Sequence, residues 1–205
     1  MSPIVVRAAV PADYPAVARL TVDAYRADGQ LNEASATYAE TLADVAARAE
    51  AGDLLVAVDR ATDGAADDGA DGAADGAADR ATGGDRVLGS VLYVEPGSRY
   101  AELSRAGESE FRMLAVDPAA QGRGVGRTLV QACVDRAAAA GCTAVVICVR
   151  DFAMAAQKLY MSLGFARVPE LDWSPLPGVS LLALRLEIEP GDRRLEIDED
   201  HRGLV

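Results

Sequence analysis

The 205-residue sequence contains few aromatic residues, three cysteines and a single histidine. His201, the only histidine, lies in a polar C-terminal segment, which argues against histidine catalysis. The cysteines are odd in number and lack metal-ligand spacing, so we expect reduced thiols, no metal and a cytoplasmic protein. No run reaches the roughly 18 apolar residues of a membrane span. Residues 1–10 also lack the basic, apolar and small-residue regions of a signal peptide.

The net charge of −12 is concentrated in two segments. Residues 61–85 contain seven Asp and one Arg, and residues 189–205 contain six acids and three Arg. These segments account for −6 and −3, which leaves the rest of the chain nearly balanced at −3. This balance argues against a surface that binds nucleic acid, and it does not by itself indicate a cationic substrate.

Segment 61–85 consists only of Ala, Asp, Gly, Thr and Arg. Because it has no large apolar residue, burial cannot offset the entropy of ordering it, and we predict a disordered loop inserted between two strands. Its aspartates lack the spacing and closing Glu of an EF-hand calcium loop. We therefore predict one domain over residues 1–189 that carries this insert, followed by a flexible tail over 190–205.

Strand and helix patterns alternate along the rest of the chain. β-Branched and apolar runs predict strands at 4–10, 54–58, 87–94, 111–116, 144–149 and 179–188. Helical spacing follows Asp13, a candidate N-cap, and ends at Gly29. Further helices are expected at 34–51, 128–140 and 153–163. The interleaved order predicts a single mixed α/β domain.

The most informative segment is Gln121-Gly122-Arg123-Gly124-Val125-Gly126-Arg127, between a predicted strand and a predicted helix. Alternate glycines before a helix N-terminus favour binding of a phosphate. A Walker A loop would need a Lys, which is missing here. A dinucleotide-binding loop would need glycine where Arg127 stands, and an acidic residue within 140–149, where there is none.

The loop fits the pattern [Q/R]-x-x-G-x-[G/A], and the sequence here resembles the GNAT superfamily of N-acetyltransferases. Leu114-Ala115-Val116-Asp117-Pro118 before the loop and the Tyr160-to-Phe165 ending of the last helix strengthen the resemblance. It implies a mostly antiparallel mixed sheet with splayed central strands, flanked by helices. It also implies acetyl-CoA, or another acyl-CoA, as donor. The amides of Gln121 to Arg127 would hold its pyrophosphate, and the main chain of Leu114, Ala115 and Val116 would pair with the pantetheine arm.

The resemblance also implies two catalytic residues. Glu110 matches the position of a carboxylate general base in several family members, with Glu108 or a bound water as alternatives. Tyr160 matches the tyrosine that protonates the CoA thiolate, although packing in the core would also account for it. Two positions depart from the family pattern, since Cys148 replaces a strand Glu and Ala153 replaces a helix-start Asn. We interpret Cys148 as a small core residue.

The resemblance implies acetyl transfer to a small-molecule or peptide amine, by direct transfer in a ternary complex. The alternatives are a non-catalytic acyl-CoA-binding or sensor module and a dinucleotide-binding protein. We expect neither nucleic acid nor membrane as a partner, and a homodimer stays open. Acceptor contacts are expected from the first two helices and the loops before the last strand, with these candidates: Tyr25, Tyr38, Tyr100, Asp172 and Trp173.

Overall fold

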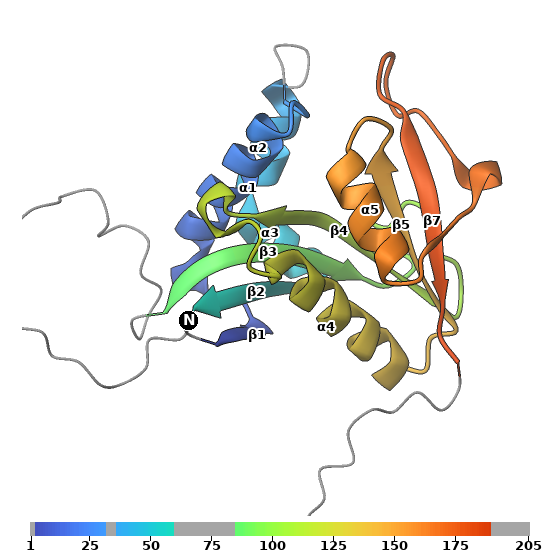
Figure 1. The fold of residues 1–205 in the computed structure, drawn as a ribbon, viewed down its shortest axis with the longest axis horizontal. Helices are drawn as coiled ribbons and strands as arrows, with labels where there is room; N and C mark the ends of the chain where they lie inside the picture. The colour runs from blue at the N-terminus through green and yellow to red at the C-terminus, as the bar shows by residue number, and fades with distance from the viewer. Residues whose placement is uncertain (1–2, 32–35, 60–84, 190–205) are drawn as a thin grey trace, which may run out of the picture.

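The computed structural model describes residues 3–31, 36–59 and 85–189 (Figure 1). The predicted tail and, apart from Asp85, the predicted insert lie outside these residues. Within the described ranges, no helix has both the length and the apolar character needed to cross a membrane.

The described residues form a seven-stranded sheet in the order β1-β2-β3-β4-β5-β7-β6. Every neighbouring pair is antiparallel except β4 and β5, which run parallel. This confirms the predicted mixed, mostly antiparallel sheet. The short β6 was not predicted, because two residues give no periodic signal. The strands span Ile4–Ala8 (β1), Asp53–Asp59 (β2), Arg86–Val94 (β3), Glu108–Val116 (β4), Ala144–Arg150 (β5), Ala166–Arg167 (β6) and Leu181–Glu187 (β7).

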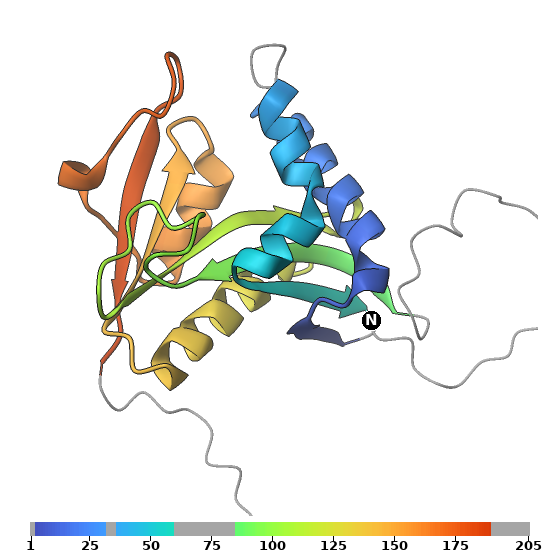
Figure 2. The same ribbon diagram turned by 180° about the vertical axis from the view of Figure 1, so that it is seen from behind.

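Helices cover both faces of the sheet. Figures 1 and 2 show α1 and α3 on one face and α4 on the other. The helix bounds are Tyr14–Ala27 (α1), Ala36–Ala43 (α2), Val45–Ala51 (α3), Val125–Ala139 (α4) and Met154–Ser162 (α5).

One prediction for these helices was wrong. The single helix expected at 34–51 is two helices, because the Asp44 side chain accepts the Ala47 N–H at 3.1 Å and caps a new helix. Asp13 does occupy the N-cap position of α1, but its side chain accepts no hydrogen bond from the amides of that helix. Its buried carboxylate instead binds the Arg7 guanidinium through bonds of 2.6 and 3.0 Å and accepts the Val10 N–H.

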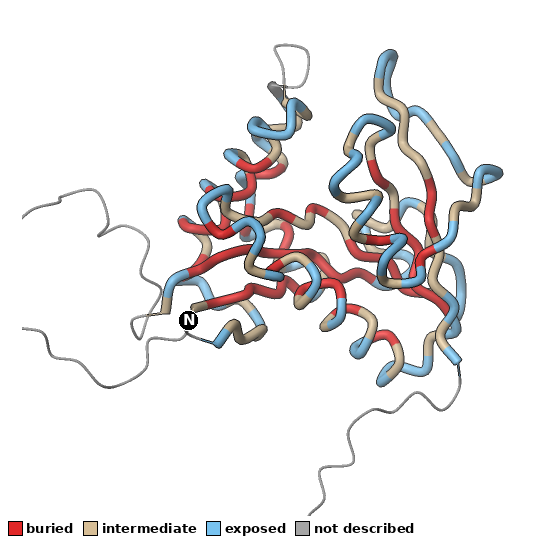
Figure 3. Tube along the Cα trace, in the orientation of Figure 1, coloured by how far each residue is buried: buried red, intermediate tan, exposed pale blue. Residues whose placement is uncertain are grey.

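The core has two parts, one on each face of the sheet (Figure 3). In β2, Leu55 and Ala57 pack on the α4 side, whereas Leu54, Val56 and Val58 pack on the α1 side. This alternation follows from the two-residue period of a strand. Because both faces are covered, β2 has an unbroken apolar run from Leu54 to Val58, and β3 is apolar from Val87 to Val94 except at Gly89 and Ser90.

A glycine in β3 allows the N-terminal end of α4 to approach the sheet. A Cβ at Gly89 would lie 2.8 Å from the Ala115 carbonyl oxygen and 2.9 Å from Val125 Cγ1. We expect Gly89→Ala to lower the free energy of unfolding by about 2 kcal/mol, measured by urea denaturation. Gly178→Ala is the control, since Gly178 has φ +78° and no atom within 4 Å of an added Cβ. Its cost of about 1 kcal/mol would be backbone strain alone. An equal loss in both variants would contradict the steric explanation.

Candidate active site

The central parallel strands separate soon after they begin. Only Glu108, Ser109 and Glu110 of β4 pair with β5, opposite Ala144 to Val146. Figure 1 shows the two strands diverging beyond this point. Within the described residues, the edge of β4 from Phe111 to Val116 therefore has no neighbouring strand on the β5 side. The predicted splay of the central strands is confirmed, and the main chain of Leu114 to Val116 lies along the open edge.

A bulge in β4 accompanies the separation. The register between β3 and β4 shifts by one residue between Ser90 and Leu92. Opposite this shift, Met113 adopts φ 53°, the one non-glycine residue with positive φ in the described ranges. Such a conformation costs about 1–2 kcal/mol in an L-residue. A bulge bends its strand, and the second half of β4 diverges from β5 beyond Glu110.

The glycine loop leads directly into α4, which begins at Val125, three residues earlier than expected. Gly122 and Gly124 have φ of 76° and 84°, and no atom lies within 4 Å of a Cβ added at either. These two glycines are required by the backbone conformation rather than by close neighbours. Gly126 differs, because its added Cβ would lie 3.2 Å from Leu159 Cδ2. It allows the first turn of α4 to pack against α5.

The loop presents a row of amide groups. The N–H groups of Gln121 and Arg123 point to backbone carbonyls of Pro118 and Ala120, at 3.4 Å each. In the described part of the chain, the structure gives five other loop amides no protein acceptor. Together with the N-terminal dipole of α4, they suit an anion such as a pyrophosphate. These amides belong to Gly122, Gly124, Val125, Gly126 and Arg127.

The two loop arginines are fixed by neighbouring elements. Arg123 forms an ion pair of 2.9 Å with Asp59 at the end of β2. Arg127 donates to Ser162 Oγ at 2.8 Å, at the end of α5. The loop is thus connected to the sheet on one side and to α5 on the other.

Glu110 lies where β4 and β5 part, and it is fully buried. Its Oε2 accepts the N–H groups of Glu102, Leu103 and Ser104 at 2.9–3.1 Å. Its Oε1 has no hydrogen-bond partner in the described residues and lies 4.0 Å from Arg112 Nε. One oxygen therefore holds the loop before β4, and the other can still accept a proton.

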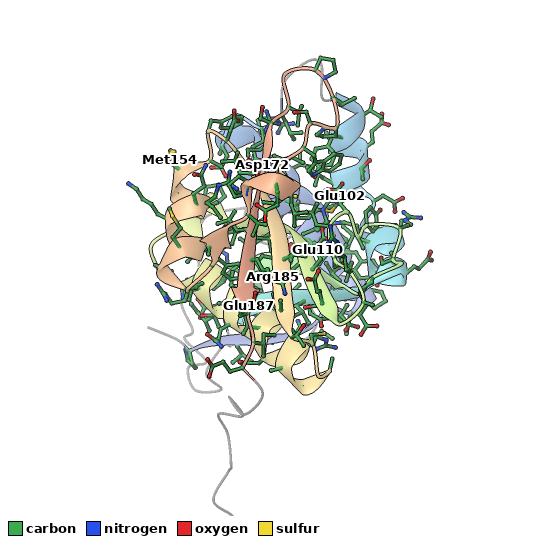
Figure 4. The ribbon with its side chains drawn as sticks, turned by 90° about the vertical axis from the view of Figure 1, so that its right-hand side faces the viewer. Glu102, Glu110, Met154, Asp172, Arg185 and Glu187 are labelled. Atoms are coloured by element: carbon green, nitrogen blue, oxygen red, sulfur yellow. The ribbon has the colours of Figure 1, made fainter. Side chains whose placement is uncertain are left out.

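Glu108, the alternative base, has both oxygens engaged. It forms an ion pair with Arg185 of β7 and accepts the Arg105 N–H at 2.9 Å. Figure 4 shows Glu110 together with Glu102 and Arg185. These contacts favour a structural role for Glu108.

Tyr160 lies in α5, and its ring packs with Phe111 of β4 and Phe165, with centroids 5.8 Å away in each case. Burial raises the pKa of the phenol above its ordinary value. The hydroxyl therefore stays protonated through the neutral range and can serve as a proton donor. Tyr160 is both a core residue and, from its position beside the splayed strands, a candidate acid.

Cys148 contacts Trp173, one of the acceptor candidates. Trp173 Nε1 donates to Cys148 Sγ at 3.3 Å, and burial raises the pKa of the thiol to about 11. A neutral thiol is a poor nucleophile, which agrees with a packing role. Asp172 binds Arg167 through both carboxylate oxygens and accepts the Ala183 N–H. Its charge is therefore used within the fold.

The other three acceptor candidates, Tyr25, Tyr38 and Tyr100, lie close together. Charged residues that the sequence did not single out lie beside them. The rings of Tyr25 and Tyr38 lie 6.1 Å apart, and Arg112 donates to the Tyr100 carbonyl oxygen. Arg112 also forms an ion pair with Glu102. A third charged residue, Arg48 of α3, is buried in the same cluster. No motif marks Glu102, Arg112 and Arg48, since they come from three separate segments: the loop before β4, β4 itself and α3.

Comparisons with known proteins agree with the geometry of the site. Residues 58–165 match the profile of the Acetyltransferase (GNAT) family. An N-acetylaspartate synthetase of Danio rerio is 35% identical over 94 residues, which cover 44% of this chain and 33% of that protein. The chain thus spans about a third of the length of this curated relative.

Three solved structures have the same fold. The ribosomal-protein-S18-alanine N-acetyltransferase of Escherichia coli is 17% identical, covers 94% of this chain and 99% of its own, and has a TM-score of 0.57. A GCN5-related N-acetyltransferase of Kribbella flavida is 27% identical, with coverage of 90% and 98% and a TM-score of 0.56. The structure of yncA from Salmonella typhimurium with its cofactor acetyl-CoA is 22% identical, with coverage of 91% and 94% and a TM-score of 0.56.

Proposed function

Because the chain belongs to the GNAT acetyltransferase family, we propose that it transfers an acetyl group from acetyl-CoA to a primary amine. The observation that carries the proposal is the open edge of β4 beside the glycine loop. An unpaired strand edge suits the amide-bearing pantetheine arm, and amides without a protein acceptor suit the pyrophosphate. The residues proposed to bind acetyl-CoA are Leu114, Ala115, Val116 and Gln121 to Arg127.

Direct transfer within a ternary complex requires an unprotonated amine, a polarised carbonyl and a protonated leaving thiolate. In the proposal, Glu110 Oε1 accepts the amine proton, directly or through a water. The Tyr160 hydroxyl donates a proton to the sulfur as the C–S bond breaks. Backbone N–H groups near Val116 polarise the thioester carbonyl.

The relatives support a donor and a class of acceptor. The yncA structure contains acetyl-CoA, and the names of two relatives specify an amino acid and a protein alanine as acetylated groups. Each is an amine on a carbon skeleton that also carries a carbonyl or carboxylate group. The proposal for this chain is therefore N-acetylation of an amine.

The first test is the choice of ligand. We expect acetyl-CoA at about 100 times its Kd to stabilise the protein by about 2.7 kcal/mol, which raises Tm by several degrees in a thermal-shift assay. NAD and ATP at the same concentration are the controls, and neither should change Tm. A shift with NAD but not with acetyl-CoA would contradict the proposal and support a dinucleotide site.

A further inference from the structure

Arg48 is an uncompensated buried charge. Its side chain has 0% exposure, and Nε, Nη1 and Nη2 all lack a hydrogen-bond partner in the described residues. Burial lowers the pKa of this guanidinium, yet arginine keeps its proton at neutral pH. A buried charge without a partner is strongly destabilising, so its presence calls for a counter-ion.

The residues around Arg48 do not supply that counter-ion. Tyr25, Tyr38 and Tyr100 interact electrostatically with it. Burial raises the pKa of the Tyr25 and Tyr38 phenols, so both stay neutral and offer O–H donors. Asp44, the acid that interacts electrostatically with Arg48, uses its carboxylate to cap α3 at Ala47.

A neighbouring arginine shows the contrast. Arg112 forms an ion pair with Glu102, lies 4.0 Å from Glu110 Oε1 and donates to the Tyr100 carbonyl oxygen. Its charge is satisfied within the protein. The cluster of Arg48, Arg112, Tyr25, Tyr38 and Tyr100 therefore has one cation that remains unpaired.

This cluster connects to the proposed reaction site. Tyr25 interacts electrostatically with both Arg48 and Tyr160. Tyr25 and Tyr38 are partly exposed, so the cluster reaches the surface at these two rings. The free amides at the start of α4 lie on the opposite face of the sheet from α3 (Figures 1 and 2). An anion at Arg48 is therefore separate from the phosphates of the donor.

We propose that Arg48 binds the carboxylate of the acceptor, so that the acceptors are amines that carry a carboxylate, such as free amino acids. The planar guanidinium matches a carboxylate through paired N–H bonds, and the neutral tyrosine hydroxyls add further donors. This inference rests on the proposed acetyl transfer, and it names the class of acceptor for that reaction.

The test compares each amino acid with its amide and its decarboxylated amine. Acetyl transfer is measured at saturating acetyl-CoA, and kcat/KM is expressed per unprotonated amine. We expect the wild type to prefer the carboxylate form by about 30-fold or more, and Arg48→Met to lose that preference. The preference is the ratio of the two kcat/KM values, measured within each variant. Arg48→Lys, which keeps the charge without the planar fork, should retain part of the preference.

Arg26→Met is the matched control, since Arg26 of α1 is exposed and pairs only with Asp23 in the described residues. It should keep the full carboxylate preference. Wild-type acetylation of amines and amino acids at equal efficiency would overturn the inference while leaving acetyl transfer intact. A preference for the aminophosphonate analogue over the carboxylate would overturn it as well.

A second measurement does not depend on turnover. With CoA present, amino acids should raise the Tm of the wild type more than their amides do, and they should leave Arg48→Met unchanged. Carboxylate-dependent binding without any acetylation would support the Arg48 site and contradict the proposed function. Without added ligand, the Tm of Arg48→Met should be equal to or higher than that of the wild type, because a buried unpaired charge is removed. A fall of several degrees would instead indicate a structural role for Arg48.

Discussion

We expect Tyr160→Phe to lower kcat for acetyl transfer about 100-fold, the lower end of the range for general acid catalysis. Phenylalanine keeps the ring that packs between Phe111 and Phe165 and removes only the hydroxyl. The fold and the affinity for CoA should therefore stay close to the wild type. Steady-state release of CoA thiol measures kcat, and calorimetry measures CoA binding.

The role of Tyr160 as a general acid also predicts how kcat depends on pH. A general acid must be protonated, and burial raises the pKa of Tyr160 above its ordinary value near 10. Loss of the acid form therefore begins only above about pH 10. Between about pH 7 and pH 9, we therefore expect titration of Tyr160 to cause no fall in kcat. Any fall in the wild type in this range should also be present in Tyr160→Phe.

Tyr93→Phe is the control for Tyr160→Phe. Tyr93 belongs to the same core cluster, and its hydroxyl has no partner in the described residues. Removal of the Tyr93 hydroxyl should change kcat less than about twofold, since Tyr93 has no proposed role in proton transfer. Full activity in Tyr160→Phe would contradict the acid assignment. Binding of CoA by the wild type without turnover on any amine would favour the non-catalytic acyl-CoA-binding alternative.

The second large effect is expected for Glu110→Gln, with a fall in kcat of about 100-fold. The glutamine carbonyl can still accept the amides of Glu102, Leu103 and Ser104, while its NH₂ group cannot take a proton. Bonds to a neutral acceptor are weaker than bonds to a carboxylate, so we also expect about 1–2 kcal/mol less stability. Rate assays below the melting transition separate the two effects.

Glu108→Gln is the matched control, because Glu108 is in the same strand and is held by Arg185 and the Arg105 N–H. It should lose stability and keep most of its kcat. The reverse result, with a slow Glu108→Gln and an active Glu110→Gln, would assign the base to Glu108. A destabilised but fully active Glu110→Gln would mean that Glu110 only anchors the loop before β4.

Local features of the site were accessible from the sequence. Gly122 and Gly124 stand where the backbone needs positive φ, and such residues mark a loop before a helix without knowledge of the rest of the fold. The apolar runs of β4 and β5 follow the two-residue strand period in the same local way. The break between α2 and α3 was missed, since apolar spacing continues through Asp44 and only its side-chain bond to Ala47 ends the pattern.

The strand–loop–helix unit around Gln121 to Arg127 could be inferred from the sequence alone, and with it the family and the expected donor. Backbone conformation and hydrophobic period depend on neighbouring residues, so they can be read in order along the chain. The pairing of the charges became visible only in the folded chain. There, Arg112 pairs with Glu102 and Asp172 with Arg167, while Arg48 is buried and has no counter-ion among the described residues. Burial and pairing depend on segments brought together by folding, and the free energy of a charge depends on both.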